Sequence, residues 1–117
     1  MKTSEKIRQR LKEKEVRFHS NDNIAEYIEK GEIEELQKEV EDSFSGVLDA
    51  LVIDTENDHN TKETARRVAK MYMKEIFAGR FVNPPKVTSF PNMGYRSLYT
   101  SGPISVKSTC AHHFQNI

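Results

Sequence analysis

Residues 33–52 read IEELQKEVEDSFSGVLDALV, and this stretch decides the fold of the N-terminal half of the chain. Its apolar residues recur at steps of three and four, at Ile33, Leu36, Val40, Phe44, Val47, Leu48, Leu51 and Val52. An α-helix with 3.6 residues per turn places such positions on one face. The pattern predicts one long amphipathic helix that ends in a polar loop from Asp54 to Asn60.

Two shorter helical patterns precede this helix. The first lies within residues 2–18, where lysine and arginine leave only a narrow apolar stripe of Ile7, Leu11 and Phe18, so we expect a peripheral helix. The second follows the turn-forming and capping cluster at residues 20–23. It is short, because Gly31 interrupts its apolar positions Ile24, Tyr27 and Ile28.

A further helix is predicted over residues 65–78, with Thr64 as its N-cap and Gly79 as its stop. Its apolar face consists of Val68, Ala69, Tyr72, Met73, Ile76 and Phe77. Its opposite face carries Arg66, Arg67, Lys70 and Lys74. We interpret these four cations as solvated or paired with acidic residues, in preference to a role in phosphate binding.

The periodicity changes after the Asn83-Pro84-Pro85 sequence, where proline prevents helix continuation. Residues 87–90, 97–100 and 104–108 are rich in β-favouring residues and are separated by proline and glycine. Helices followed by strands predict an α+β fold, in which N-terminal helices precede the start of an antiparallel sheet. Because two or three short strands cannot form a covered sheet alone, we expect the chain to be the first half of a larger domain.

Composition places the chain among small polar globular domains. It has 117 residues, of which 36% are hydrophobic, and its mean hydropathy is −0.72. A chain of this size buries only about two-thirds of its unfolded surface, so we expect a thin core and assembly of several copies into a homo-oligomer.

The charges balance in total but are separated along the chain. The net charge is +4 over residues 1–19, −11 over residues 22–58 and +7 over residues 62–117. The zero total argues against a nucleic-acid partner, and the separated blocks favour contacts between acidic and basic regions, within one chain or between copies. A single cysteine, no apolar stretch of membrane-spanning length and no signal-peptide pattern predict a cytoplasmic protein without a membrane partner.

One cluster of chemically able side chains stands out, Cys110-Ala111-His112-His113. Cysteine and histidine three residues apart can chelate Zn²⁺, whose bonds to sulfur and nitrogen are about 2.0–2.3 Å long. Two ligands do not complete a site, and His19 and His59 lie in polar segments typical of surface residues. The pattern alone also permits a cysteine and histidines without any metal role.

Four motifs in succession make the chain similar to the GTP cyclohydrolase I family. They are ETARRVAKMY at residues 63–72, EIFAG at 75–79, PKVT at 85–88 and STCAHHF at 108–114. The resemblance covers about residues 44–114. It implies a division into an N-terminal helical region, 1–43, and the first part of a T-fold domain, 44–117, whose sheet is incomplete in this chain.

The resemblance also implies a chemistry. Members of the family are zinc-dependent hydrolases that convert GTP to 7,8-dihydroneopterin triphosphate and formate, for pterin, folate or 7-deazaguanine biosynthesis. Cys110 and His113 match two zinc ligands of the family motif, and His112 matches the histidine that transfers protons beside the metal.

Three departures from the family pattern qualify this expectation. Ala111 stands where the family usually has glutamate, and Ala65 replaces a proline. The third zinc ligand and the guanine-binding glutamate of the family would lie beyond Ile117. We therefore expect a fragment that is inactive alone, or alternatively a truncated, non-catalytic module that assembles with full-length subunits.

Overall fold

The computed structural model describes all residues from Met1 to Ile117 and divides into two units. The N-terminal unit, Met1–Asn83, contains α1 (Thr3–Glu13), the 3₁₀ turn η1 (Ala25–Tyr27), α2 (Glu32–Ala50), α3 (Thr64–Met71), the π-helical turn η2 (Tyr72–Ile76) and α4 (Ala78–Phe81). The C-terminal unit, Pro84–Ile117, contains neither a helix nor a strand. None of the helices combines the length and apolar character needed to cross a lipid bilayer.

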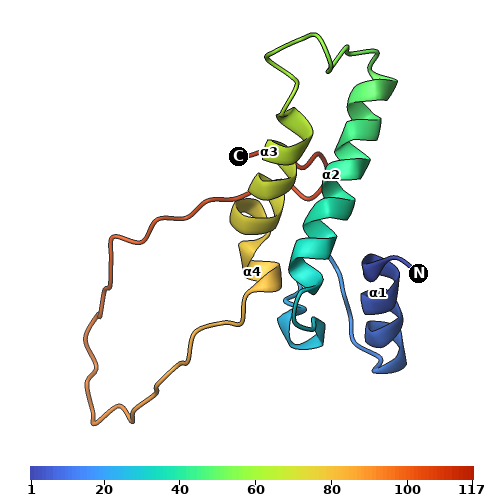
Figure 1. The fold of residues 1–117 in the computed structure, drawn as a ribbon. Helices are drawn as coiled ribbons and strands as arrows, with labels where there is room; N and C mark the ends of the chain where they lie inside the picture. The colour runs from blue at the N-terminus through green and yellow to red at the C-terminus, as the bar shows by residue number, and fades with distance from the viewer. The chain divides into compact units, whose positions relative to one another are not determined.

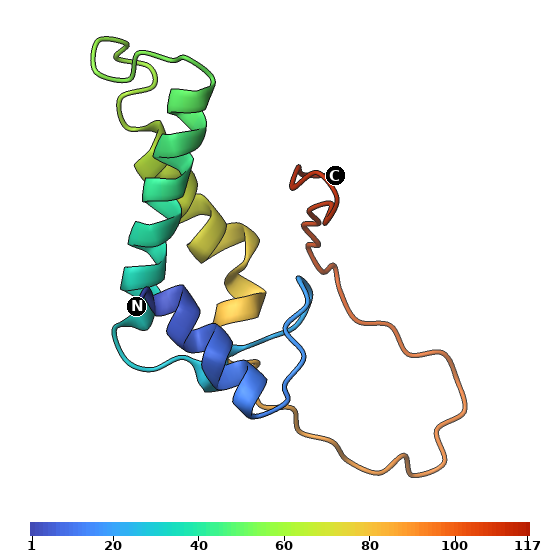
Figure 2. The same cartoon turned by 90° about the vertical axis from the view of Figure 1, so that its right-hand side faces the viewer.

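Within the N-terminal unit, α2 and α3 lie side by side and run in opposite directions, and α1 lies beside the first half of α2 (Figures 1 and 2). The long helix expected over residues 33–52 is confirmed as α2. The ring of Phe44 on α2 stacks on that of Tyr72, with centroids 5.4 Å apart, and ties α2 to the end of α3.

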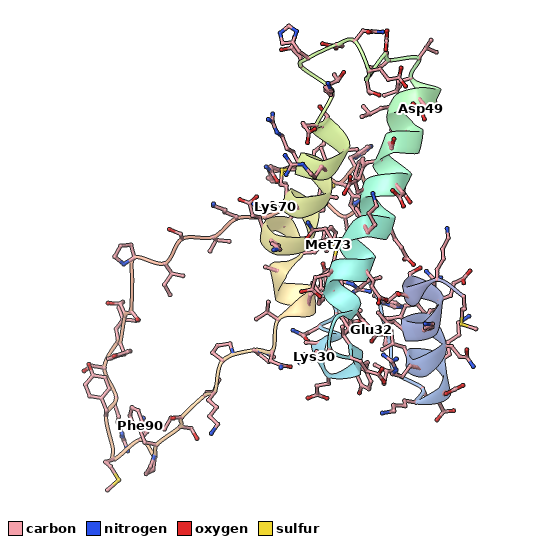
Figure 3. All side chains as sticks on the ribbon, in the orientation of Figure 1. Lys30, Glu32, Asp49, Lys70, Met73 and Phe90 are labelled. Atoms are coloured by element: carbon pink, nitrogen blue, oxygen red, sulfur yellow. The ribbon has the colours of Figure 1, made fainter.

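The core of this unit is thin, as expected, and α1 supplies much of it. Its central cluster consists of Ile7, Leu11, Ile24, Leu36 and Met73. Figure 3 shows Met73 directed toward α2, whereas Lys70 lies on the outer side of α3. The expected narrow apolar stripe is confirmed at Ile7 and Leu11, and these two residues lie at the centre of the core. The helix is shorter than residues 2–18, and it buries Ile7 and Leu11 almost completely.

Ionic contacts fix α1 to α2. The guanidinium of Arg10 lies 2.9 Å from a carboxylate oxygen of Glu32 and 3.3 Å from one of Glu29. At the other end of α1, the Ser4 N–H donates to the Glu39 carboxylate at 3.2 Å. A carboxylate is favourable there because the first N–H groups of a helix have no partner within it. The expected contact between basic and acidic regions of one chain is confirmed.

The end of the α3–η2–α4 segment differs from the prediction. Thr64 begins the helix as its first residue and does not cap it, and Gly79 lies inside α4 and does not stop it. The Phe77 N–H donates to the Tyr72 carbonyl at 2.8 Å, five residues back, which marks the π-helical turn.

A clasp from residues 23–24 keeps the chain helical beyond Gly79. The Asn23 side-chain amide donates to the carbonyls of Gly79 and Val82, at 2.9 and 2.7 Å, and the Ile24 N–H donates to the Arg80 carbonyl at 2.8 Å. Carbonyls that end a helix need such partners. The partners come from a distant segment, so the local sequence does not reveal them.

The prediction of an antiparallel sheet after Pro85 is wrong. The C-terminal unit has one isolated antiparallel bridge, between Thr109 and Asn116, and no residue from 84 to 107 forms a backbone–backbone hydrogen bond. Its apolar side chains are solvent-exposed, as Phe90 in Figure 3 illustrates at 87% exposure. β-propensity reflects packing against a neighbouring strand, so without a paired strand it does not produce a sheet.

The C-terminal end of α2 holds a strained residue. The N–H groups of Val52 and Ile53 donate to the carbonyls of Asp49 and Leu48, at 3.0 and 3.2 Å, and close the helix in a Schellman motif. This motif requires one left-handed residue, and Val52 occupies that position with a φ of 62°. A β-branched side chain disfavours this conformation, for which glycine is the usual choice.

Replacing Val52 with Gly removes this strain, and we expect the free energy of unfolding to rise by about 1 kcal/mol. The Val52 side chain is 91% exposed, so its loss forfeits little buried area. Val47→Gly, inside the same helix, is the control and should lower the free energy of unfolding by about 1 kcal/mol. Urea denaturation measures both, and a Val52→Gly variant as unstable as Val47→Gly would contradict the argument.

The Arg10–Glu32 pair makes a second prediction about stability. The hydrogen bond from Arg10 lowers the pKa of the Glu32 carboxyl below its ordinary value of 4.5, against the opposing effect of burial. The stabilisation is therefore complete above that pH and is lost as the pH falls through the lowered pKa. Glu32→Gln should cost about 1.5–3 kcal/mol at neutral pH and flatten the decline of stability in acid. Glu34→Gln, on the exposed side of the same turn, should change neither quantity in thermal melts from pH 7 to 3.

Candidate functional site

The Cys-x-His-His sequence lies at the tip of a small hairpin formed by residues 108–117. The Cys110 N–H donates to the Gln115 carbonyl at 2.9 Å, and the Ile117 N–H donates to the Ser108 carbonyl at 2.9 Å. These two bonds flank the bridge between Thr109 and Asn116. The Thr109 hydroxyl also donates to the Asn116 side-chain oxygen at 3.2 Å. The hairpin therefore fixes the backbone position from which the Cys110 side chain projects.

The turn at the hairpin tip closes between Cys110 and Phe114. The Phe114 N–H donates to the Cys110 carbonyl at 2.8 Å, so Ala111, His112 and His113 form the loop between them. Phe114 has a φ of 53°, a left-handed conformation that reverses the chain direction. The returning segment, residues 115–117, was not predicted, because its sequence contains no β-favouring pattern.

The turn brings Cys110 and His112 together. The thiol sulfur of Cys110 lies 3.7 Å from Nδ1 of His112, and Cys110 is half-buried while both histidines are exposed. His113, on the same turn, forms no hydrogen bond or ion pair in the structure. The sequence motif pairs Cys110 with His113, whereas the contact that the structure contains is between Cys110 and His112.

The chemistry of these donors fits zinc. A thiolate and an imidazole are the ligand types that Zn²⁺ prefers. The separation of 3.7 Å between Sγ of Cys110 and Nδ1 of His112 fits a hydrogen bond between these two side chains. The structure brings no group of three or more such side chains together.

The other two histidines and the basic residues of α3 and η2 precede this hairpin in the sequence, and their side chains are exposed. His19 and His59 are exposed, and so are Arg66, Arg67, Lys70 and Lys74. Arg66 pairs with Glu63 at 2.7 Å, one turn earlier. Their interpretation as surface residues is confirmed by this exposure.

Comparison with known proteins shows the family to which this sequence belongs. The sequence profile of GTP cyclohydrolase I matches residues 40–117 of the chain. The chain belongs to the GTP cyclohydrolase I family. The matched range includes most of α2, all of α3, η2 and α4, and the hairpin with Cys110, His112 and His113.

Individual relatives agree with this assignment. The GTP cyclohydrolase 1 of Shewanella baltica OS185 is 37% identical over 86 residues, which are 72% of this chain and 39% of the relative. The proteins of the same name from Shewanella oneidensis and Shewanella putrefaciens CN-32 match at the same identity, over 39% and 40% of their lengths. The chain thus matches about two-fifths of the length of these relatives. No solved structure matches it significantly.

The hairpin that carries the family motif can be tested directly. A non-hydrogen-bonded antiparallel pair brings its two α-carbons to about 4.5 Å, so we expect a strong Hα–Hα NOE between Thr109 and Asn116. Asn116→Ala removes the side-chain bond to Thr109 and should weaken this NOE severalfold. Gln115→Ala is the control, because Gln115 contributes only its backbone carbonyl. An NOE that survives Asn116→Ala at full strength would show that this side-chain bond does not hold the hairpin.

Proposed function

We propose that the chain is part of a GTP cyclohydrolase I that opens the imidazole ring of GTP and releases formate. The observation that carries the proposal is the family match through residue 117, which includes the Cys-x-His-His turn. The relatives at 37% identity bear the name GTP cyclohydrolase 1, which makes GTP the proposed substrate. The proposed product is 7,8-dihydroneopterin triphosphate.

Cys110 and His113 are the proposed zinc ligands, and His112 is the proposed proton-transfer group. Zinc held by these residues would supply a Lewis acid for hydrolysis of a ring C–N bond. The half-buried position of Cys110 and its fixed backbone support a ligand role, because the hairpin limits the directions that its side chain can take.

The contact between Cys110 and His112 suggests how His112 works. With Nδ1 3.7 Å from the Cys110 sulfur, Nδ1–H can donate to the thiolate, and Nε2 is then the atom that exchanges a proton with the substrate. Imidazole suits this role because one ring nitrogen can hold a hydrogen bond while the other gives or takes a proton. In this arrangement the thiolate both orients the ring and selects its tautomer.

The proposal also includes contributions from outside these 117 residues. The chain has a single cysteine and no cluster of three candidate ligands, so a third protein ligand must come from a further segment or another copy. Exposed apolar side chains in the C-terminal unit, among them Val87, Met93 and Leu98, support assembly with other polypeptide. We therefore expect the 117-residue chain alone to release no formate from GTP.

The test uses a hybrid in which residues 40–117 replace the matched stretch of the Shewanella baltica protein. Zinc content and formate release are measured side by side. Cys110→Ala should lose zinc and activity together, because the thiolate is a direct ligand. His112→Ala should keep its zinc and lose about 10²–10⁴-fold in rate, the usual contribution of a general acid–base group.

His59→Ala is the matched control, since His59 lies in the exposed loop after α2 and should change neither measurement. Loss of zinc from His112→Ala as complete as from Cys110→Ala would assign His112 as a ligand and refute the division of roles. A folded, zinc-loaded hybrid without formate release would instead support the non-catalytic module. Formate release by the 117-residue chain alone would contradict its expected dependence on further segments.

A further inference from the structure

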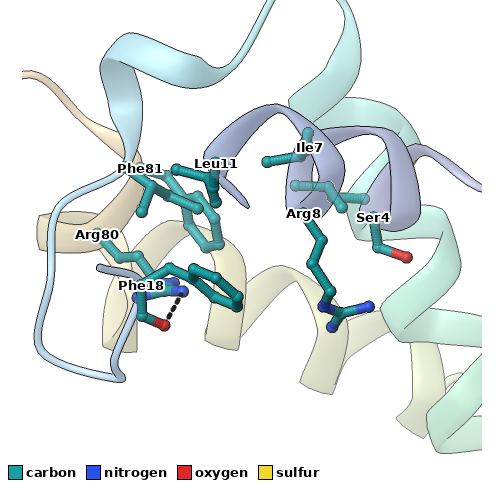
Figure 4. Close-up of a pocket in the computed structure, with 9 residues that line it drawn as sticks. Ser4, Ile7, Arg8, Leu11, Phe18, Arg80 and Phe81 are labelled. Atoms are coloured by element: carbon teal, nitrogen blue, oxygen red, sulfur yellow. Dashed lines mark hydrogen bonds between the residues drawn. The ribbon is translucent and has the colours of Figure 1, made fainter. Parts of the chain in front are cut away.

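The N-terminal unit contains a hollow that the proposed chemistry does not use. It lies between α1, the segment around residues 18–24, α2 and α4, and has a volume of about 150 Å³ (Figure 4). Its walls are mostly apolar and consist of Ile7, Leu11, Phe18, Ile24, Leu36 and Phe81. A cavity of about 150 Å³ with aliphatic and aromatic walls accommodates one benzene-sized group.

Two arginines border this hollow, and one of them is bound to the backbone. Arg80 donates to the carbonyls of His19 and Asp22, at 2.5 and 3.0 Å, and to that of Phe18 at 3.3 Å, the bond drawn in Figure 4. These bonds hold the segment over residues 18–22 against α4. Arg80 therefore forms part of the wall, with Nη1 and Nη2 bonded to these carbonyls.

The second arginine is free. Arg8 is exposed on α1, lines the hollow beside Ser4 and forms no hydrogen bond or ion pair in the structure. No carboxylate is among the residues that line this hollow, and Glu5 and Glu13, which share the outer face of α1 with Arg8, form no ion pair with it. An apolar hollow with one unpaired guanidinium at its edge is complementary to a molecule with an apolar body and one negative charge.

We propose that this hollow binds a small carboxylic acid with an aromatic or branched aliphatic body, whose carboxylate pairs with Arg8. The planar guanidinium matches a carboxylate through two parallel hydrogen bonds, and one free cation balances a single negative charge. The body replaces water on the half-buried rings of Phe18 and Phe81, above the buried side chain of Leu11. This site is independent of the proposed cyclohydrolase chemistry, since every lining residue precedes Asn83.

The probe is benzoate, titrated into ¹⁵N-labelled 117-residue protein and followed by amide chemical shifts. We expect saturable shifts centred on residues 4–11, 18–24 and 80–81. Benzyl alcohol, which has the ring without the charge, should bind about tenfold more weakly, and acetate, which has the charge without the ring, should not saturate over the same range.

Arg8→Gln is the decisive variant, because Arg8 is exposed and its replacement leaves the core intact. It should lower the affinity for benzoate about tenfold and leave that for benzyl alcohol unchanged. Lys6→Gln removes the same charge from another side of α1 and should retain the wild-type preference. Unchanged benzoate affinity in Arg8→Gln, equal binding of benzyl alcohol and benzoate, or shifts scattered over the surface would each overturn the proposal.

Discussion

The contact of α1 with α2 is the constraint on which the N-terminal unit depends. Ile7 and Leu11 provide two of the five side chains in the central cluster, and Arg10 fixes their helix to Glu32 at the start of α2. Arg10 is only one residue from Leu11, so the ion pair and the apolar contact hold the same turn. In a unit with so few buried side chains, the loss of one such contact removes a large share of the core.

The region where α3 ends depends on contacts with a distant segment. The π-helical turn, the stacking of Tyr72 on Phe44, and the clasp from Asn23 occur within a few residues of one another. Together they carry the chain past Gly79 to Phe81 and place Arg80 against the carbonyls of residues 18–22. The same contacts form the wall of the hollow beside α1, so the packing of the unit and its candidate binding site have one origin.

The Cys-x-His-His turn is built on a different principle, because its order comes from bonds within ten residues. Three backbone bonds and the Thr109–Asn116 contact define it without a surrounding core. A motif of this kind presents a thiol and an imidazole at a fixed turn and leaves both histidines exposed. The lack of a core around the hairpin agrees with a match that covers about two-fifths of the relatives' length.

The sequence by itself determined α2, the polar loop after it, the thin core and the family, because periodicity, turn residues and motifs are local properties of the chain. It identified Cys110, His112 and His113 as a group, but not which histidine lies beside the thiol, since that depends on the left-handed Phe114 and the return of residues 115–117. It failed for the sheet, because β-favouring residues specify a surface that fits a partner strand and do not supply that partner. Only the tertiary structure decided the central place of α1 in the core, the helical path beyond Gly79 and the carbonyl contacts of Arg80. Each of these depends on contacts between groups that lie far apart in the sequence.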